Sequence, residues 1–97
     1  MSINYVWYNH FIMTKKMQAV KNLDLSQKLA SYIAENPEAV KGLPTKASFV
    51  AFSSSDESLN MENQKLIKSV LAEGKRVIKA IQTNDKLNPW KFSQVAY

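Results

Sequence analysis

The sequence predicts a small α/β domain of two or three layers, in which an N-terminal helix precedes a right-handed β-α-β unit. Three observations support this fold class. One amphipathic helical pattern ends at a proline, two short apolar runs flank a second helical pattern, and a glycine lies shortly before the second run. A chain of 97 residues supports one hydrophobic core, so we expect a single domain over residues 1–97.

The first predicted helix spans residues 25–35. Its apolar face is formed by four side chains at relative positions 0, +4, +7 and +8: Leu25, Leu29, Tyr32 and Ile33. Asp24 has the type and position of an N-cap. Asn36 precedes Pro37, and a residue before proline is displaced from the α region, so the helix ends there. Residues 37–40 restart as a single turn.

A strand, a helix and a second strand follow. Residues 47–52 (ASFVAF) are apolar on both alternating faces, as in a buried strand. Residues 58–73 form a helix whose apolar stripe consists of Leu59, Leu66, Ile67, Val70 and Leu71. Gly74 ends that helix, and residues 77–82 (VIKAIQ) form the second strand. A helix of about 16 residues rises ~24 Å, close to the length of either strand, so the two strands run parallel.

Two strands leave two unpaired edges, so further strands must complete the sheet. Residues 3–12 (INYVWYNHFI) and 90–97 (WKFSQVAY) are rich in aromatic and β-branched residues. We expect either segment, or both, to add an edge strand, within the chain or across a dimer interface. The domain then comprises an aromatic N-terminal extension over residues 1–12, a core over 22–83 and a C-terminal aromatic segment over 84–97.

Composition narrows the class of protein. The chain has no cysteine, which excludes disulfides and thiolate metal sites, and it has no apolar run long enough for a membrane span. We therefore expect a cytoplasmic protein without a membrane partner. His10 is the one histidine, and nothing near it in the sequence has the spacing of a metal site or the type of a nucleophile. We expect no catalytic residue, no metal site, no cofactor and no enzymatic activity.

The junction between the first strand and the second helix is the candidate ligand loop. It lies at the carboxyl end of a parallel strand, where open α/β folds bind ligands. Its candidate anion-binding or ligand-binding residues are Ser53, Ser54, Ser55 and Ser58. Asp56 and Glu57 would repel an anion, however, so the favoured interpretation is a capping loop whose acids complement the helix dipole.

Aromatic side chains and basic charges gather at both ends of the chain. The candidate interaction residues are Tyr5, Trp7, Tyr8, Phe11, Trp90 and Phe92. They favour a small non-enzymatic protein-interaction module that self-associates as a homodimer, because the predicted sheet is too narrow to close itself. The alternative is a nucleic-acid-associated regulator that stacks bases on these rings. Since twelve of the 13 basic residues are lysine, and arginine is the better phosphate ligand, this alternative ranks second.

Several short motifs resemble one family. They are Asn22-Leu23-Asp24-Leu25-Ser26, Glu35-Asn36-Pro37-Glu38, Leu43-Pro44, the strand Phe49 to Phe52, Asp56, Asn60 and Asn63, and Gly74 before Val77-Ile78. Over about residues 20–83 the chain is similar to a small prokaryotic family of unknown function. The resemblance implies the β-α-β unit and a bacterial or archaeal cytoplasmic origin, and it implies no activity.

Overall fold

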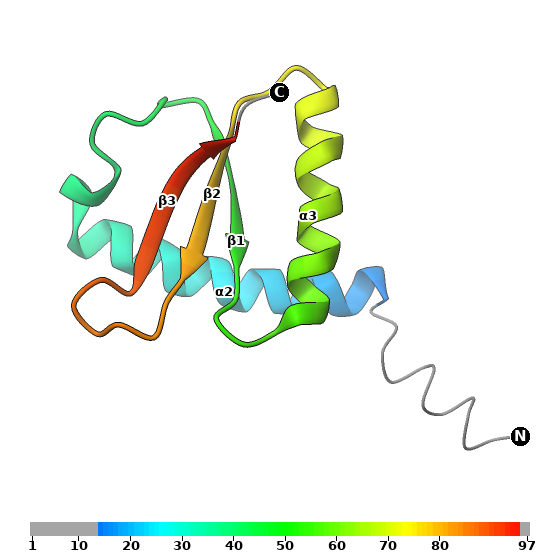
Figure 1. Ribbon diagram of the computed structural model, residues 1–97, viewed down its shortest axis with the longest axis horizontal. Helices are drawn as coiled ribbons and strands as arrows, with labels where there is room; N and C mark the ends of the chain where they lie inside the picture. Colours follow the sequence, from blue (N-terminus) through cyan, green and yellow to red (C-terminus); the bar gives the residue numbers. More distant parts are fainter. Residues whose placement is uncertain (1–13, 96–97) are drawn as a thin grey trace, which may run out of the picture.

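The computed structural model describes residues 14–95. Its elements are α2 (Lys15–Glu35), the 3-10 turn η1 (Pro37–Val40), β1 (Ser48–Phe52), α3 (Glu57–Ala72), β2 (Val77–Gln82) and β3 (Trp90–Val95) (Figure 1). The sheet order is β1-β2-β3, with β1 parallel to β2 and β2 antiparallel to β3. The predicted small α/β domain is confirmed. Within the described range, no helix is long and apolar enough to cross a membrane.

Helix α2 packs across one face of the sheet, while α3 lies along the outer edge of β1 and contributes Leu59 and Ile67 to the cores on its two faces (Figure 1). Because side chains alternate along a strand, the sheet has two distinct faces. On one face Ala51 and Ala80 pack against Leu25 and Leu29 of α2. The other face, which packs against α3, is formed by Val50, Phe52 and Val77 with Ile67. In Figure 1, α2 accordingly crosses behind the strands while α3 runs alongside β1.

The first helix begins at Lys15 and not at Leu25, so the predicted start was wrong. Thr14 is the N-cap, and its hydroxyl accepts from the N–H of Met17 at 3.1 Å. Asp24 lies inside the helix and pairs with Lys28, one turn later, at 3.3 Å. The error has a physical cause. In the first turns of α2, the side chains that face α3 are the polar Gln18 and Asn22, so these turns show no apolar periodicity in the sequence.

The elements between residues 37 and 82 confirm the prediction to within one residue. The first helix ends at Asn36, whose N–H donates to the carbonyls of Tyr32 and Ile33. Gly74 follows α3 with φ of +80°, the left-handed conformation that glycine adopts without strain. The C-terminal segment supplies β3, as predicted, while the N-terminal segment 3–12 lies outside the described residues.

Candidate functional site

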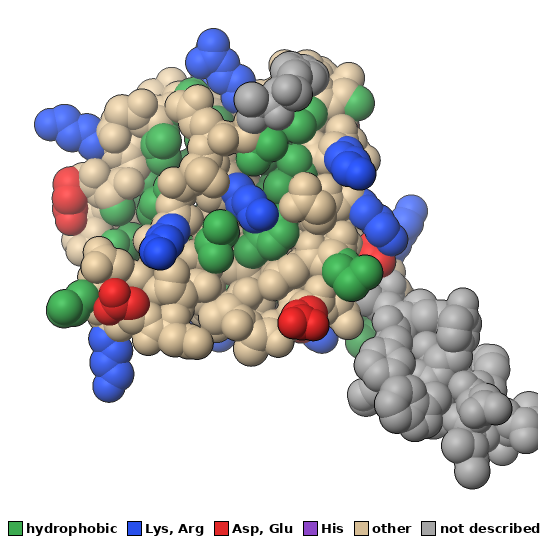
Figure 2. Space-filling model, in the orientation of Figure 1, with side chains coloured by type: hydrophobic (Ala, Val, Ile, Leu, Met, Phe, Trp, Pro, Cys, Tyr) green, Lys and Arg blue, Asp and Glu red, His purple; other side chains and the backbone are tan. Residues whose placement is uncertain are grey.

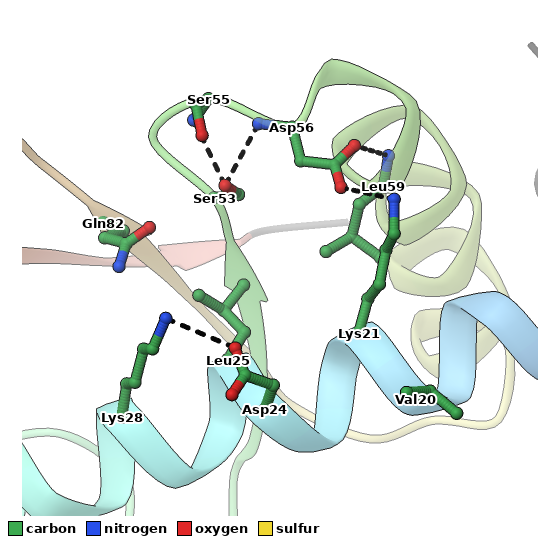
Figure 3. A pocket seen from close by; sticks show the side chains of 10 residues that line it. All are labelled: Val20, Lys21, Asp24, Leu25, Lys28, Ser53, Ser55, Asp56, Leu59 and Gln82. Carbon is green, nitrogen blue, oxygen red and sulfur yellow. Dashed lines mark hydrogen bonds and ion pairs between the residues drawn. The ribbon is translucent and has the colours of Figure 1, made fainter.

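A cavity of about 290 Å³ opens at the carboxyl ends of the parallel strands β1 and β2. Its lining comes from α2, the loop between β1 and α3, the first turn of α3 and the end of β2 (Figure 3). Its lining residues are Val20, Lys21, Asp24, Leu25, Lys28, Ser53, Ser55, Asp56, Leu59 and Gln82. This is the position where open α/β sheets bind ligands.

The loop wall is held by its own hydrogen bonds. The Ser53 hydroxyl accepts from the N–H groups of Ser55 and Asp56, each at 3.1 Å. The Ser54 N–H donates to the side-chain oxygen of Gln82 at 3.1 Å, and the Ser54 hydroxyl lies 3.3 Å from the same oxygen. These amides are therefore turned into the loop, which gives it a fixed shape and leaves no cradle of consecutive backbone donors for a phosphate.

Asp56 combines two roles at the start of α3. One carboxylate oxygen accepts from the Leu59 N–H at 3.1 Å, which is an N-cap bond, and the other accepts from the Lys21 ammonium at 2.8 Å. The Lys21 hydrogen bond, followed by the Leu59 N–H, holds the pKa of Asp56 below its ordinary value. The pair joins α2 to the loop and neutralises this side of the cavity.

The opposite side of the cavity presents hydrogen-bond donors. The side-chain oxygen of Gln82 is fixed by Ser54, so its NH₂ group is turned away from the loop. Lys28 extends from α2 on the same side as Gln82 in Figure 3, and Asp24 lies beside it at 3.3 Å. The Lys28 and Asp24 side chains are 60% and 69% exposed, so their ion pair is a weak surface pair.

A buried amide cluster lies next to this cavity, and sequence reasoning did not find it. Asn63 of α3 is 0% exposed. Its side-chain oxygen accepts from the amides of Gln18 at 3.0 Å and Asn22 at 2.9 Å. Its NH₂ donates to the Asn22 side chain at 2.7 Å and to the Ala51 carbonyl at 2.9 Å. One carboxamide thus joins α2, α3 and β1 with all of its hydrogen-bonding groups used.

A sequence signal for this cluster exists. Asn63 lies four residues from both Leu59 and Ile67, the most buried apolar side chains of α3, so it occupies a core-facing position of the helix. Leu66, which the predicted stripe included, is instead 39% exposed. A polar residue at a core-facing position requires partners, and Gln18 and Asn22, four residues apart on α2, provide them.

Asn60 and Asn63 close the carboxyl end of the free edge of β1. Ser48 donates its N–H to the Arg76 carbonyl preceding β2, so even-numbered residues of β1 bond to β2 and odd-numbered residues point outward. The outward Ala51 carbonyl is bonded by Asn63. Both backbone groups of the outward Ser53 are bonded by Asn60, at 2.7 and 2.9 Å.

At the free edge of β3, the outward backbone groups point away from the sheet. Thr83 donates its N–H to the Pro89 carbonyl at 2.7 Å, and these two residues continue the β2–β3 register. In an antiparallel ladder such pairs alternate, so odd-numbered residues of β3 bond to β2. The N–H and C=O groups of Trp90, Phe92 and Gln94 therefore point away from the sheet. In Figure 1, β3 is the outermost strand on the side away from α3.

Next to this edge, part of the sheet face that packs against α3 is uncovered. Lys91 and Ser93 of β3 are exposed there, and Lys79 and Ile81 of β2 are half-buried. The Lys79 ammonium lies 4.3 Å from the ring centroid of Phe52. Figure 2 shows hydrophobic side chains gathered over the strands beside α3, with basic side chains among them.

Comparison with known proteins identifies the family. The model of the family of unknown function DUF5647 matches residues 17–87, which is more than half of the chain. The chain belongs to this family. The resemblance to a family of unknown function is thereby confirmed. Neither the curated proteins nor the solved structures contain a match.

The DUF5647 match includes the cavity and the amide cluster, whereas β3 follows it. Two of the six predicted interaction residues, Trp90 and Phe92, lie in the described part of the chain. Trp90 is 7% exposed and belongs to the core beneath α2. Phe92 is half-buried and meets Phe49 edge-on, with centroids 6.2 Å apart. The other predicted interaction residues lie outside the described part of the chain: Tyr5, Trp7, Tyr8 and Phe11.

The predicted serine loop is brought together at the cavity. Ser53 and Ser55 line it, Ser54 bonds to Gln82, and Ser58 lies half-buried in the first turn of α3. Lys21, Lys28 and Gln82 were not among the predicted site residues, because they come from two other elements. Among residues 14–95, no group of three or more histidine, cysteine, aspartate or glutamate side chains has the arrangement of a metal site.

Proposed function

We propose that this chain is a non-enzymatic interaction module that self-associates as a homodimer through the free edge of β3. The observation that carries the proposal is the row of outward backbone groups at Trp90, Phe92 and Gln94, set by the Thr83–Pro89 hydrogen bond. An open strand edge of this kind is a template for pairing with another strand. A second copy of β3 supplies a matching set of groups.

Because only the even-numbered residues of β3 point outward, they determine which residues face each other in a dimer of two β3 strands. Two antiparallel copies of β3 related by a two-fold axis satisfy all outward groups when Phe92 lies opposite the partner's Phe92 and Trp90 lies opposite the partner's Gln94. Lys91 then faces the partner's Ser93, so no like charges lie directly opposite each other. The two Phe92 rings form an aromatic cross-strand pair, which adds to the stability of the interface.

Two further observations support this proposal over its alternatives. The loop at the strand ends, where α/β enzymes often hold reacting groups, uses the hydroxyls of Ser53 and Ser54 and the amides of residues 54–56 for its own hydrogen bonds, which favours a non-enzymatic role. The buried Trp90 ring offers no open face for a base, and Lys79 lies over Phe52. Both facts favour self-association over stacking on single-stranded nucleic acid.

The test is the molar mass by light scattering over ~10 to 200 µM chain. We expect a dimer that dissociates on dilution. Gln94→Pro removes an outward N–H, which an edge strand tolerates, and should shift the protein towards monomer. The matched control Gln94→Thr keeps that N–H and should dimerise like the native chain. A native monomer throughout this range, or equal dimerisation of the two variants, would refute the proposed interface.

A further inference from the structure

We propose that the cavity at the strand ends binds a free α-amino acid with an aliphatic side chain such as that of leucine, in its zwitterionic form. None of the lining residues belongs to β3, so this site is separate from the proposed dimer edge. Three features of the cavity define the ligand: an oriented amide donor, an exchangeable ion pair, and apolar walls of limited size.

The Gln82 amide provides the oriented donor. Its oxygen is held by the N–H of Ser54 at 3.1 Å, an acceptor role that only the oxygen can fill. The NH₂ group must then point to the other side, towards the cavity. Gln82 is half-buried, so solvation of this NH₂ by water is reduced and an acceptor from a ligand is favoured. A carboxylate is the acceptor that gains most from such a donor.

The Asp24–Lys28 pair makes the site specific for a zwitterion. At 3.3 Å and with both side chains well exposed, the pair gains little from its own contact, so either member can bind a ligand instead. A ligand carboxylate that binds Lys28 and Gln82 displaces the Asp24 carboxylate. An ammonium on the adjacent carbon of the ligand gives Asp24 a new partner. An α-amino acid carries these two groups on one carbon.

The rest of the cavity sets the charge and size of the ligand. Lys21 and Asp56 neutralise each other at 2.8 Å, so the lining as a whole has no net charge and disfavours a dianion such as phosphate. Val20, Leu25 and Leu59 provide an apolar surface for a side chain. A volume of about 290 Å³ is at the small end of ligand cavities, which suits a single amino acid.

The experiment is a titration of the full chain, followed through its backbone amide resonances, with four probes. L-leucine carries both charges. The compounds 4-methylpentanoate and isoamylamine keep its isobutyl side chain with one charge each, and the fourth probe is inorganic phosphate. We expect saturable shifts at Lys28, Gln82 and Ser55 with leucine, and affinities at least about tenfold weaker for the other three probes. No saturable shift with leucine, or equal affinity for leucine and either single-charge probe, would overturn the assignment.

Two variants test the assigned contacts. Gln82→Glu keeps an oxygen for Ser54 and replaces the donor by a charge of the wrong sign, so leucine affinity should fall by at least about tenfold. Asp24→Asn should weaken leucine binding to the level of 4-methylpentanoate. Lys68→Met, an exposed change on α3, is the control and should bind leucine as the native chain does. If the first two variants bind like this control, the site is wrong. The same titration of Gln94→Pro separates this result from failure of the proposed dimer.

Discussion

The two edges of the sheet are finished in different ways. On β1, the side chains of Asn60 and Asn63 bond the outward carbonyl of Ala51 and both backbone groups of Ser53, so helix α3 closes the carboxyl end of that edge without a strand. On β3, the outward groups of Trp90, Phe92 and Gln94 are left at the surface by the register of the hairpin. The difference shows that an amide side chain can substitute for a neighbouring strand, and that one edge of this sheet remains open to a partner.

The closed edge depends on burial as well as on hydrogen bonds. Asn63 is 0% exposed, and a buried carboxamide is stabilising only when its oxygen and both N–H groups have partners. All are satisfied here by Gln18, Asn22 and Ala51. At the β3 edge, by contrast, exposure rises along the strand from the buried Trp90 to the exposed Gln94, so pairing there is not required for folding.

The largest effect is expected from breaking the closed edge. Asn63→Leu removes the central amide and leaves the Ala51 carbonyl buried without its partner, so we expect a loss of about 3 kcal/mol in the free energy of unfolding. The melting temperature should fall by roughly 12 to 24 °C for a domain of this size. The control is Gln64→Leu, which also replaces a carboxamide side chain by leucine, but at the exposed neighbouring position. It should alter the melting temperature by only a few degrees. Equal melting temperatures for the two variants would show that the amide cluster does not hold the edge.

A proline pair on β3 tests the open edge. Ser93 donates its N–H towards β2, whereas the N–H of Gln94 points outward. Ser93→Pro should therefore cost about 2 kcal/mol in the free energy of unfolding at low protein concentration, because it removes a ladder bond and leaves its acceptor unpaired. Gln94→Pro should cost no more than about 0.5 kcal/mol in the same measurement. Chemical denaturation of both variants checks this, and the reverse order would show that the assigned alternation of β3 is wrong.

The parts of the fold that could be predicted from the sequence are those set by apolar periodicity and by turn residues. Pro37 and Gly74 marked helix ends, and the apolar runs around Val50 and Ile78 marked the parallel strands. The first turns of α2 could not be found in this way. Their inward side chains are polar. Gln18, for example, is half-buried and bonds to Asn63 of α3, 45 positions further along the chain.

The candidate site shows the same limit. The serine loop was located because the end of a strand is visible in the sequence. Lys21 and Lys28 could not be assigned to it, because α2 reaches the loop only when the tertiary fold forms. The outward groups of β3 also depend on information that the sequence does not carry, since a shift of the hairpin register by one residue would turn them towards β2.

The smallest expected effect concerns the ion pair that joins α2 to the loop beside the closed edge. Asp56→Asn keeps an N-cap side chain for Leu59 and removes the charge that faces Lys21, so it isolates the ion pair from the cap. At pH 7 we expect a loss of less than about 1 kcal/mol in the free energy of unfolding, seen as a fall of a few degrees in melting temperature.

The pKa of Asp56 is lowered in the folded state from its ordinary value of 3.8, so its stabilising effect is fully present above that pH and is lost as the pH falls through the folded-state pKa. The difference in melting temperature between the native chain and Asp56→Asn should therefore be constant from pH 7 to about pH 5 and shrink below about pH 4. Lys21→Met should reproduce the loss at pH 7, and combining it with Asp56→Asn should add little, because both changes break one interaction. A difference that persists unchanged in acid would assign the effect to the cap and not to the ion pair.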